Sequence, residues 1–229
     1  MDYFFEALWK ALHLILKGDA ETYSALRTTL LVSSVSTAMS LAAGMPLGFI
    51  LGYVSFPGRR ALRTVADTLL SLPTVLIGLL VYGLLTHKGP LGHFGLLFTV
   101  QAIILGQTLL AIPIVVALTA SAVEALDARL RVTLLSLGAD GCRRFLTSLR
   151  EARFGVLTAA VTAYGRVLTE VGIAIMVGGN IKGHTRTLTT AIALETNKGE
   201  FASGVALGLI LLFLAFCVNI ALHGLRKGA

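Results

Sequence analysis

The sequence contains little charge. Only 14% of its 229 residues are Asp, Glu, Lys or Arg, and the mean hydropathy is +0.83. A soluble globular domain carries about 25% charged residues. This deficit excludes an ordinary soluble domain and predicts an integral membrane protein. The length suits one membrane domain of five or six helices, since each needs about 20 apolar residues to cross a bilayer.

The sequence also lacks the motifs of an enzyme or of a metal protein. Cys142 and Cys217 are the only cysteines, and they fall in a basic loop and an apolar run, so we expect no disulfide. No Cys/His spacing suggests a metal site, and no Walker glycine loop, GxSxG or HExxH motif occurs. We therefore expect no catalytic residue, metal or cofactor in this chain. If ATP is used, ATP and Mg would be bound by a separate ATPase subunit.

Long windows without charge locate five predicted membrane spans. They lie at about 28–56, 62–88, 96–123, 154–177 and 201–225. The fourth is the exception, because it carries Arg166 and Glu170. The predicted fold is therefore all-α, with five transmembrane helices in a membrane domain over 21–229. An amphipathic helix over 1–20 precedes them and is expected to lie in the membrane interface, since it is too short and too charged to span.

The distribution of Lys and Arg predicts the orientation. Three of these residues lie in the 57–63 loop, six in the 124–153 loop and two in the C-terminal tail, eleven in all, against seven on the opposite side. Because positive loops stay inside, we expect those three segments in the cytoplasm and the N-terminal helix on the outer face. The net charge of +7 reflects these anchors, and we expect no nucleic-acid partner.

Proline and glycine occur inside the predicted spans. Pro46, Pro73 and Pro113 should each kink a helix, which suits a bundle arranged around a pathway. Glycines also recur every fourth residue in the first span, at 44, 48 and 52. Such a stripe allows close helix packing, either within the chain or between two copies.

Arg166 and Glu170 are four residues apart and share one side of a helix. Ionisable groups at membrane depth usually face a protein interior or an aqueous cavity. The two side chains could line a translocation route, or they could form a structural ion pair. We slightly favour the structural role for Arg166, because Glu170 can neutralise it.

The segment after the fourth span, 176–201, is polar and basic. It contains flexible backbone at 178–180, cations at Lys182, His184 and Arg186, and four threonines between 185 and 190. Its amides, hydroxyls and cations could meet an oxyanion. It could equally be a solvated outer loop that contacts another protein.

The basic interruption at 124–153 separates two apolar segments. It reads as a helix, a turn at Gly138 and a second helix, and we expect a docking surface for a cytoplasmic partner. It resembles the EAA loop of ABC-importer permeases, which forms a coupling helix seated in the ATPase subunit. The resemblance implies a coupling element of Gly138, Ala139, Asp140, Gly141, Phe145 and Leu149. The sequence departs from the pattern at Val132–Leu134, where the acidic residue is missing, and at Arg150, where proline is usual.

More of the chain resembles the tungstate-uptake branch of these permeases, which is close to the molybdate and sulfate branches. The matching stretches are SLPTVLIGLLVYGLL (71–85), GPLGHFGLLFT (89–99) and GRVLTEVGIAIMVGGNIKGHTRTLTTAIALETNKGEF (165–201). The resemblance implies the type I importer fold, like that of molybdate and methionine permeases. It also implies location in the cytoplasmic membrane of a bacterium or archaeon.

The same resemblance implies the partners and the route. It predicts a homodimer with one pore on the two-fold axis, two cytoplasmic ATPase subunits, and an outer tungstate-binding protein that faces the 179–200 loop. The expected pore residues are Arg166, Thr169, Glu170, Gly178, Gly179 and Asn180. Molybdate or sulfate is the alternative substrate. An ion-coupled secondary transporter is less favoured, since Glu170 is the only deep acid and no internal repeat occurs.

Overall fold

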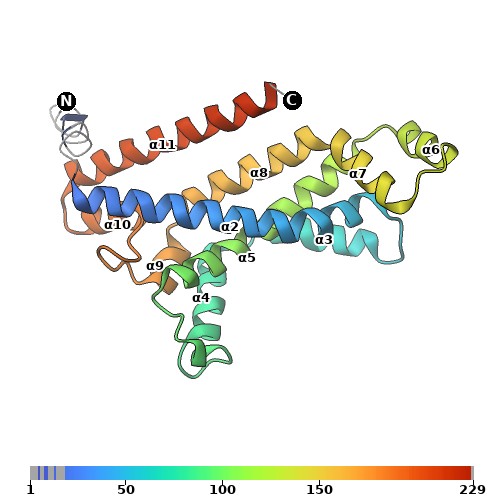
Figure 1. Ribbon diagram of the computed structural model, residues 1–229. Coiled ribbons are helices and arrows are strands. Elements are labelled where there is room, and N and C mark those ends of the chain that lie inside the picture. The colour runs from blue at the N-terminus through green and yellow to red at the C-terminus, as the bar shows by residue number, and fades with distance from the viewer. Residues whose placement is uncertain (1–4, 6–7, 10–12, 14–18, 228–229) are drawn as a thin grey trace.

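The computed structural model describes residues 5, 8, 9, 13 and 19–227. All of the regular structure in this described part is helical, and most of it forms an elongated bundle from which one helix projects (Figure 1). The elements are α2 (Ala20–Tyr53), α3 (Arg59–Leu69), α4 (Thr74–Leu85), η1 (Gly92–Phe94), α5 (Val100–Glu124), α6 (Ala128–Ser136), α7 (Gly141–Glu151), α8 (Arg153–Leu168), α9 (Gly172–Gly178), α10 (Leu188–Asn197) and α11 (Phe201–Lys227).

Three of the described helices are long and apolar enough to cross a membrane. They are α2, α5 and the Phe201–Ile220 part of α11. Two helix pairs, α3–α4 and α8–α9, pass the same test together but are bent by 97° and 58°. By length and composition, the described part of the chain thus has up to five candidate crossings, if each bent pair counts as one.

The two bent pairs coincide with the predicted second and fourth spans. In the second, Pro73 is the residue before α4 and lies at the bend rather than inside a helix. Proline has no backbone N–H to donate, so interrupting the helix at this residue costs the least free energy. Pro46 and Pro113 do lie inside helices, α2 and α5, as expected.

The first long helix starts earlier than the charge-free window suggested. It begins at Ala20 because Asp19 caps it: the carboxylate accepts hydrogen bonds from the backbone N–H of Thr22 (2.8 Å) and from its hydroxyl (2.7 Å). The predicted interfacial helix at 1–20 lies mostly outside the described residues.

Helices α2 and α5 run side by side in the same direction and form the centre of the bundle (Figure 1). The hydroxyl of Ser36 donates to the carbonyl of Ile104, and that of Ser40 donates to the carbonyl of Thr108, both at 3.2 Å. Both contacts therefore keep the same register, with partners advancing four residues at a time along each helix.

The glycine stripe continues this register toward the other end. A Cβ on Gly48 would lie 2.6 Å from the carbonyl oxygen of Val116, and one on Gly52 would lie 2.7 Å from that of Ala120. Gly44 packs against Val115 in the same way. The stripe thus serves packing inside the chain, which decides the alternative that the sequence left open.

The remaining crossings alternate in direction along the chain. Helix α8 runs opposite to α5, and α11 runs from α10 back toward the end where α6 and α7 lie (Figure 1). That end also holds the start of α3, whereas α10 and the start of α2 lie at the other end. Two of the segments assigned to one side from their positive charge, 57–63 and 124–153, therefore lie at one end of the molecule, and α11 points toward that end.

Candidate functional site

The 124–153 segment forms the expected helix–turn–helix. Gly138 has φ +67°, a conformation that a side chain would disfavour, and it reverses the chain after α6. Asp140 then caps α7, since its carboxylate accepts the N–H of Arg143 at 2.7 Å. Ala139 and Gly141 flank this cap. We call α6, α7 and their turn the α6–α7 module.

One side of the module is anchored to the bundle. The ring of Phe145 meets the ring of Phe49 edge-on, with centroids 4.5 Å apart, beside buried Val123 and Ala152. Leu149 is half-buried. The other side exposes at least half of four apolar side chains, those of Val132, Leu135, Leu137 and Leu146.

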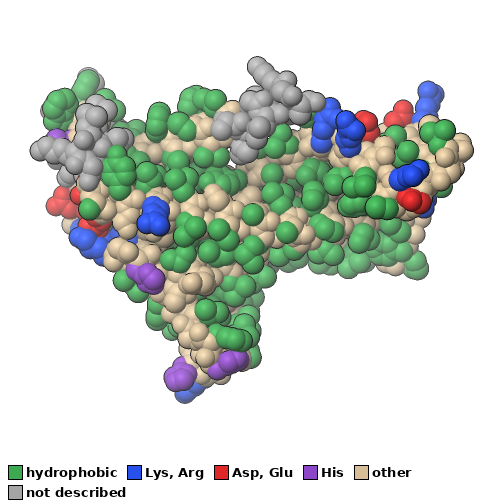
Figure 2. All heavy atoms as spheres, viewed as in Figure 1, with side chains coloured by type: hydrophobic (Ala, Val, Ile, Leu, Met, Phe, Trp, Pro, Cys, Tyr) green, Lys and Arg blue, Asp and Glu red, His purple; other side chains and the backbone are tan. Residues whose placement is uncertain are grey.

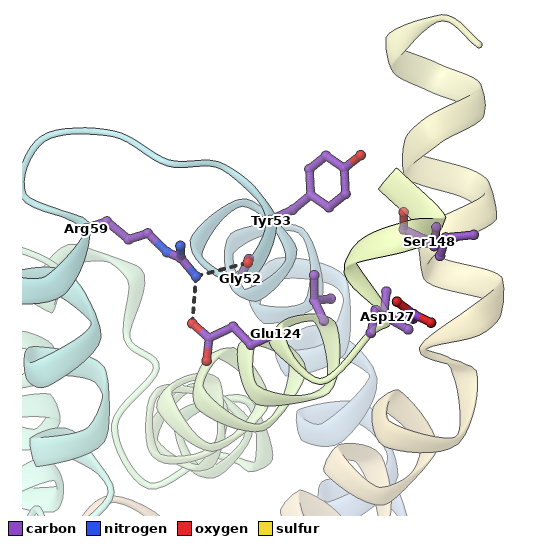
Figure 3. A pocket seen from close by; sticks show the side chains of 9 residues that line it. Gly52, Tyr53, Arg59, Glu124, Asp127 and Ser148 are labelled. Atoms are coloured by element: carbon purple, nitrogen blue, oxygen red, sulfur yellow. Dashed lines mark hydrogen bonds and ion pairs between the residues drawn. The ribbon is translucent and has the colours of Figure 1, made fainter. Parts of the chain in front are cut away.

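A cavity of about 290 Å³ lies where the module joins α2 and α5 (Figure 3). At its edge the Arg59 guanidinium donates to the carbonyl of Gly52 (3.0 Å) and pairs with Glu124 (2.7 Å). The side chain of Ser148, 1% exposed, is part of the lining. Sequence reasoning missed this pairing, because opposite charges in separate segments do not identify their partners. Arg59 thereby links the end of α2 to the last residue of α5.

The predicted Arg166–Glu170 pair forms at the bend between α8 and α9. Arg166 Nη1 lies 3.1 Å from Glu170 Oε2. The side chain of Glu170 is 3% exposed and that of Arg166 is 42% exposed. The second carboxylate oxygen of Glu170 accepts the N–H of Ile173 (3.2 Å), so Glu170 also caps the start of α9. The threonine hydroxyl at 189 donates to the Glu170 carbonyl, which fixes the bend from the other side.

The other predicted pore residues divide into two groups. Thr169 is exposed next to Arg166, at the start of the bend. Gly178, Gly179 and Asn180 lie at the far end of α9, whose seven residues span about 10 Å. Gly178 is buried against Ile103. The structure thus brings Arg166, Thr169 and Glu170 together and keeps 178–180 apart from them.

The segment after α9 is exposed at 181–184, and the threonine-rich part that follows is buried. Its threonines at 185, 187, 189 and 190 are all at most 4% exposed. Thr187 and Thr190 form a capping box that starts α10, and the Thr185 hydroxyl donates to the Gly178 carbonyl. These hydroxyls are buried and hydrogen-bonded within the fold, which disfavours them as donors to an oxyanion.

The cations of this segment also have internal partners. Lys182 Nζ lies 2.5 Å from a carboxylate oxygen of Glu21, and Arg186 pairs with the other oxygen. Arg186 Nε also donates to the side chain of Asn180 at 3.1 Å. His184 is exposed. The segment is therefore held to the first turn of α2, a contact that sequence reasoning missed because Glu21 lies far away in the chain.

Within the described residues, no group of three or more His, Cys, Asp or Glu is arranged to hold a metal ion.

Comparison with known proteins gives a consistent family. The model of the binding-protein-dependent transport system inner membrane component matches residues 44–228. The tungstate uptake system permease protein TupB of Campylobacter jejuni is 48% identical over 99% of this chain and 95% of its own length. That of Peptoclostridium acidaminophilum is 35% identical over 99% of this chain and its own full length. The molybdenum transport system permease protein ModB of Escherichia coli is 31% identical, covering 80% of this chain and 84% of the relative.

Solved structures agree on the fold. A chain from the MetNI methionine ABC transporter in an inward-facing conformation superposes with a TM-score of 0.74, over 91% of this chain and 95% of that chain. Sequence identity there is 18%, so the likeness establishes the fold alone.

Proposed function

Because this chain belongs to the family of binding-protein-dependent transport system inner membrane components, we propose that it is the membrane permease of an ATP-driven tungstate importer. The observation that carries the substrate is the 48% identity to a tungstate uptake permease over almost the whole of both chains. Identity to the molybdenum permease is lower and covers less of the chain. The permease fold itself is of the type I importer class.

The α6–α7 module is proposed as the contact with the ATPase. Two features support this role: exposed apolar side chains on α6, on α7 and at their turn, and attachment to α2 through the contact of Phe145 with Phe49. ATP and Mg are assigned to that ATPase, and hydrolysis takes place there. The permease then has no catalytic residue of its own.

The proposed transport cycle uses the rigid and bent parts of the fold differently. Helices α2 and α5 are tied by hydrogen bonds and glycine contacts, so movement of the module would move them as one unit. The bends of α3–α4 and α8–α9 are places where the angle between segments can change. ATP binding would open the pathway outward, and hydrolysis would return it to the inward state.

The partners complete the proposal. Two copies of the chain would enclose one pathway, with the module and the C-terminal end in the cytoplasm of a bacterium or archaeon. A tungstate-binding protein would dock at the opposite end, beside the Lys182–Glu21–Arg186 cluster. That binding protein, rather than the permease, would discriminate between tetrahedral dianions of similar size.

The test is reconstitution of the complete system. The chain is purified with a candidate ATPase and a tungstate-binding protein from the same organism, and ATP turnover is measured with and without tungstate. Tungstate-loaded binding protein should raise turnover. No stable complex, or no response to the loaded protein, would overturn the proposal. Calorimetry of the binding protein with tungstate, molybdate and sulfate then assigns the substrate.

A further inference from the structure

The exposed residues of α8 form a polar stripe. Beyond Arg153 at its start, the exposed positions of α8 and the adjoining turn are Thr158, Thr162, Arg166 and Thr169. Spacings of four, four and three residues place neighbours on one side of a helix. We call these four residues the α8 stripe. The buried side of α8, at Ala159, Ala163 and Val167, packs against α5.

Other exposed helix faces in the bundle have a different character. On α4 and on the described side chains of α11 most large exposed side chains are apolar, with Asn219 as a polar exception: Val75, Leu76, Leu79, Leu80 and Leu84 on α4, and Leu212, Phe213, Phe216 and Ile220 on α11. Such faces suit acyl chains or a second copy of the chain. A polar stripe does not, because ionisable groups at membrane depth face protein or water. Arg166 stands near the middle of the 153–178 crossing formed by α8 and α9, so the stripe points to an aqueous path.

The Arg166–Glu170 ion pair exposes its positively charged partner and buries its negatively charged one. Glu170 is 3% exposed, and its two oxygens are engaged by Ile173 and Arg166. The side chain of Arg166 is 42% exposed, and its guanidinium directs one N–H at Glu170. A guanidinium has five N–H donors, so most of them remain for a ligand. The exposed end of the pair is therefore a cation, although the pair as a whole is neutral.

The donors on the stripe fit an oxyanion. Thr158 and Thr169 donate to carbonyls of their own helix, whereas the Thr162 hydroxyl has no hydrogen-bond partner within the described part of the chain. Thr162 lies one helical turn from Arg166. A hydroxyl and a planar guanidinium are suitable donors for two oxygens of one tetrahedral anion.

We propose that Arg166, assisted by Thr162, is the contact for the oxyanion as it crosses the membrane. Glu170 holds the guanidinium from behind and does not touch the ion. This assignment rests on the proposed function. In the proposed dimer, two stripes present two guanidinium groups to one dianion, and each alone binds weakly enough for release.

The test separates this role from a structural one. Replacing Arg166 alone would leave Glu170 buried and unpaired, so the main variant is the double substitution Arg166→Gln/Glu170→Gln, which neutralises both partners. With ATPase and binding protein in vesicles, the double variant should assemble and remain as heat-stable as wild type. Its tungstate uptake should fall about tenfold or more, the expected loss of one charge-assisted contact. Wild-type uptake by the double variant would overturn the assignment.

A chemical rescue gives a second readout. In a background of Cys142→Ser, Cys217→Ser and Glu170→Gln, in which no buried carboxylate needs a partner, Arg166→Cys should lose uptake. A cationic trimethylammonium-ethyl thiosulfonate should restore most of it, and the anionic sulfonatoethyl reagent should not. Equal effects of the two reagents would contradict the charge requirement. Tyr164→Phe, on α8 but outside the stripe, is the control and should transport normally. If the wild-type complex takes up no tungstate, the proposed function itself fails; the inference fails alone when wild type and the double variant transport equally.

Discussion

For Glu170, the sequence predicted the ion-pair partner correctly but not the second role of the side chain at the bend. The four-residue spacing predicted its contact with Arg166, and the contact is present. The helix ends at Leu168, however, so Glu170 stands in the bend and caps Ile173. A buried carboxylate with two donors is stable at this depth. The bend, which the sequence did not reveal, decides which partner of the pair reaches the path.

Asp19 offers a prediction at the same scale. Its carboxylate caps α2, and the hydrogen bond from the Thr22 hydroxyl, followed by that from the Thr22 N–H, lowers its pKa below the ordinary value of 3.8. Asp19→Ala should destabilise the protein by about 1 kcal/mol, measured as a lower Tm in detergent at neutral pH.

The pH dependence of this effect has a definite sign. A lowered pKa in the folded state means that the ionised carboxylate stabilises the fold above about pH 3.8, and that this contribution is lost as pH falls through the folded pKa. The Tm difference between wild type and Asp19→Ala should shrink on acidification. Glu200→Ala, at an exposed position, is the control. A difference that grows at low pH would contradict the cap.

At the scale of elements, the parallel pair α2–α5 is the rigid part of the molecule. Gly48→Ala should lower stability by about 1–3 kcal/mol, because the added Cβ would lie 2.6 Å from a backbone carbonyl of α5. Gly83→Ala in α4 is the matched control, since its Cβ would meet no atom within 4 Å. The control should be neutral or up to about 1 kcal/mol stabilising. Equal Tm values for the two variants would refute the close packing.

The α6–α7 module gives a second prediction for an element. Leu137 is 77% exposed, so Leu137→Asp should leave the Tm of the isolated chain unchanged. Burying the new carboxylate against the ATPase would be costly, and co-purification with the ATPase should be lost. Thr133→Asp adds the same charge at another exposed position of the module and should retain the ATPase more fully. Unaltered co-purification of Leu137→Asp would move the docking surface elsewhere.

The sequence predicted some elements well and others poorly, for physical reasons. Windows without charge located the long helices, because burial in a bilayer requires apolar residues over a fixed length. They could not reveal the 97° and 58° bends, since hydropathy does not report direction. The threonines near 187 looked solvated because composition does not reveal a capping box. The sequence could not show whether the glycine stripe packs within the chain or against a second copy. Its partner carbonyls are on α5, about 68 residues further along the chain.

At the scale of the whole molecule, most charged side chains lie toward the ends of the bundle. The view in Figure 2 places basic and acidic side chains at the two ends of the bundle, with a broad apolar surface between them. This distribution suits a protein held across a bilayer, with a docking module at one end and the Glu21 cluster at the other. Arg166 lies on α8 with an exposed side chain, between the docking module and the Glu21 cluster.

Uptake of tungsten into sealed vesicles tests the central claim most directly. The permease and its ATPase are reconstituted with ATP at the module side, the loaded binding protein is added at the other side, and internal tungsten is measured by mass spectrometry. We predict accumulation that needs both ATP and the binding protein and that exceeds accumulation of sulfate. Accumulation driven by an ion gradient without ATP, or none at all with every component present, would contradict the assignment as an ATP-driven tungstate permease.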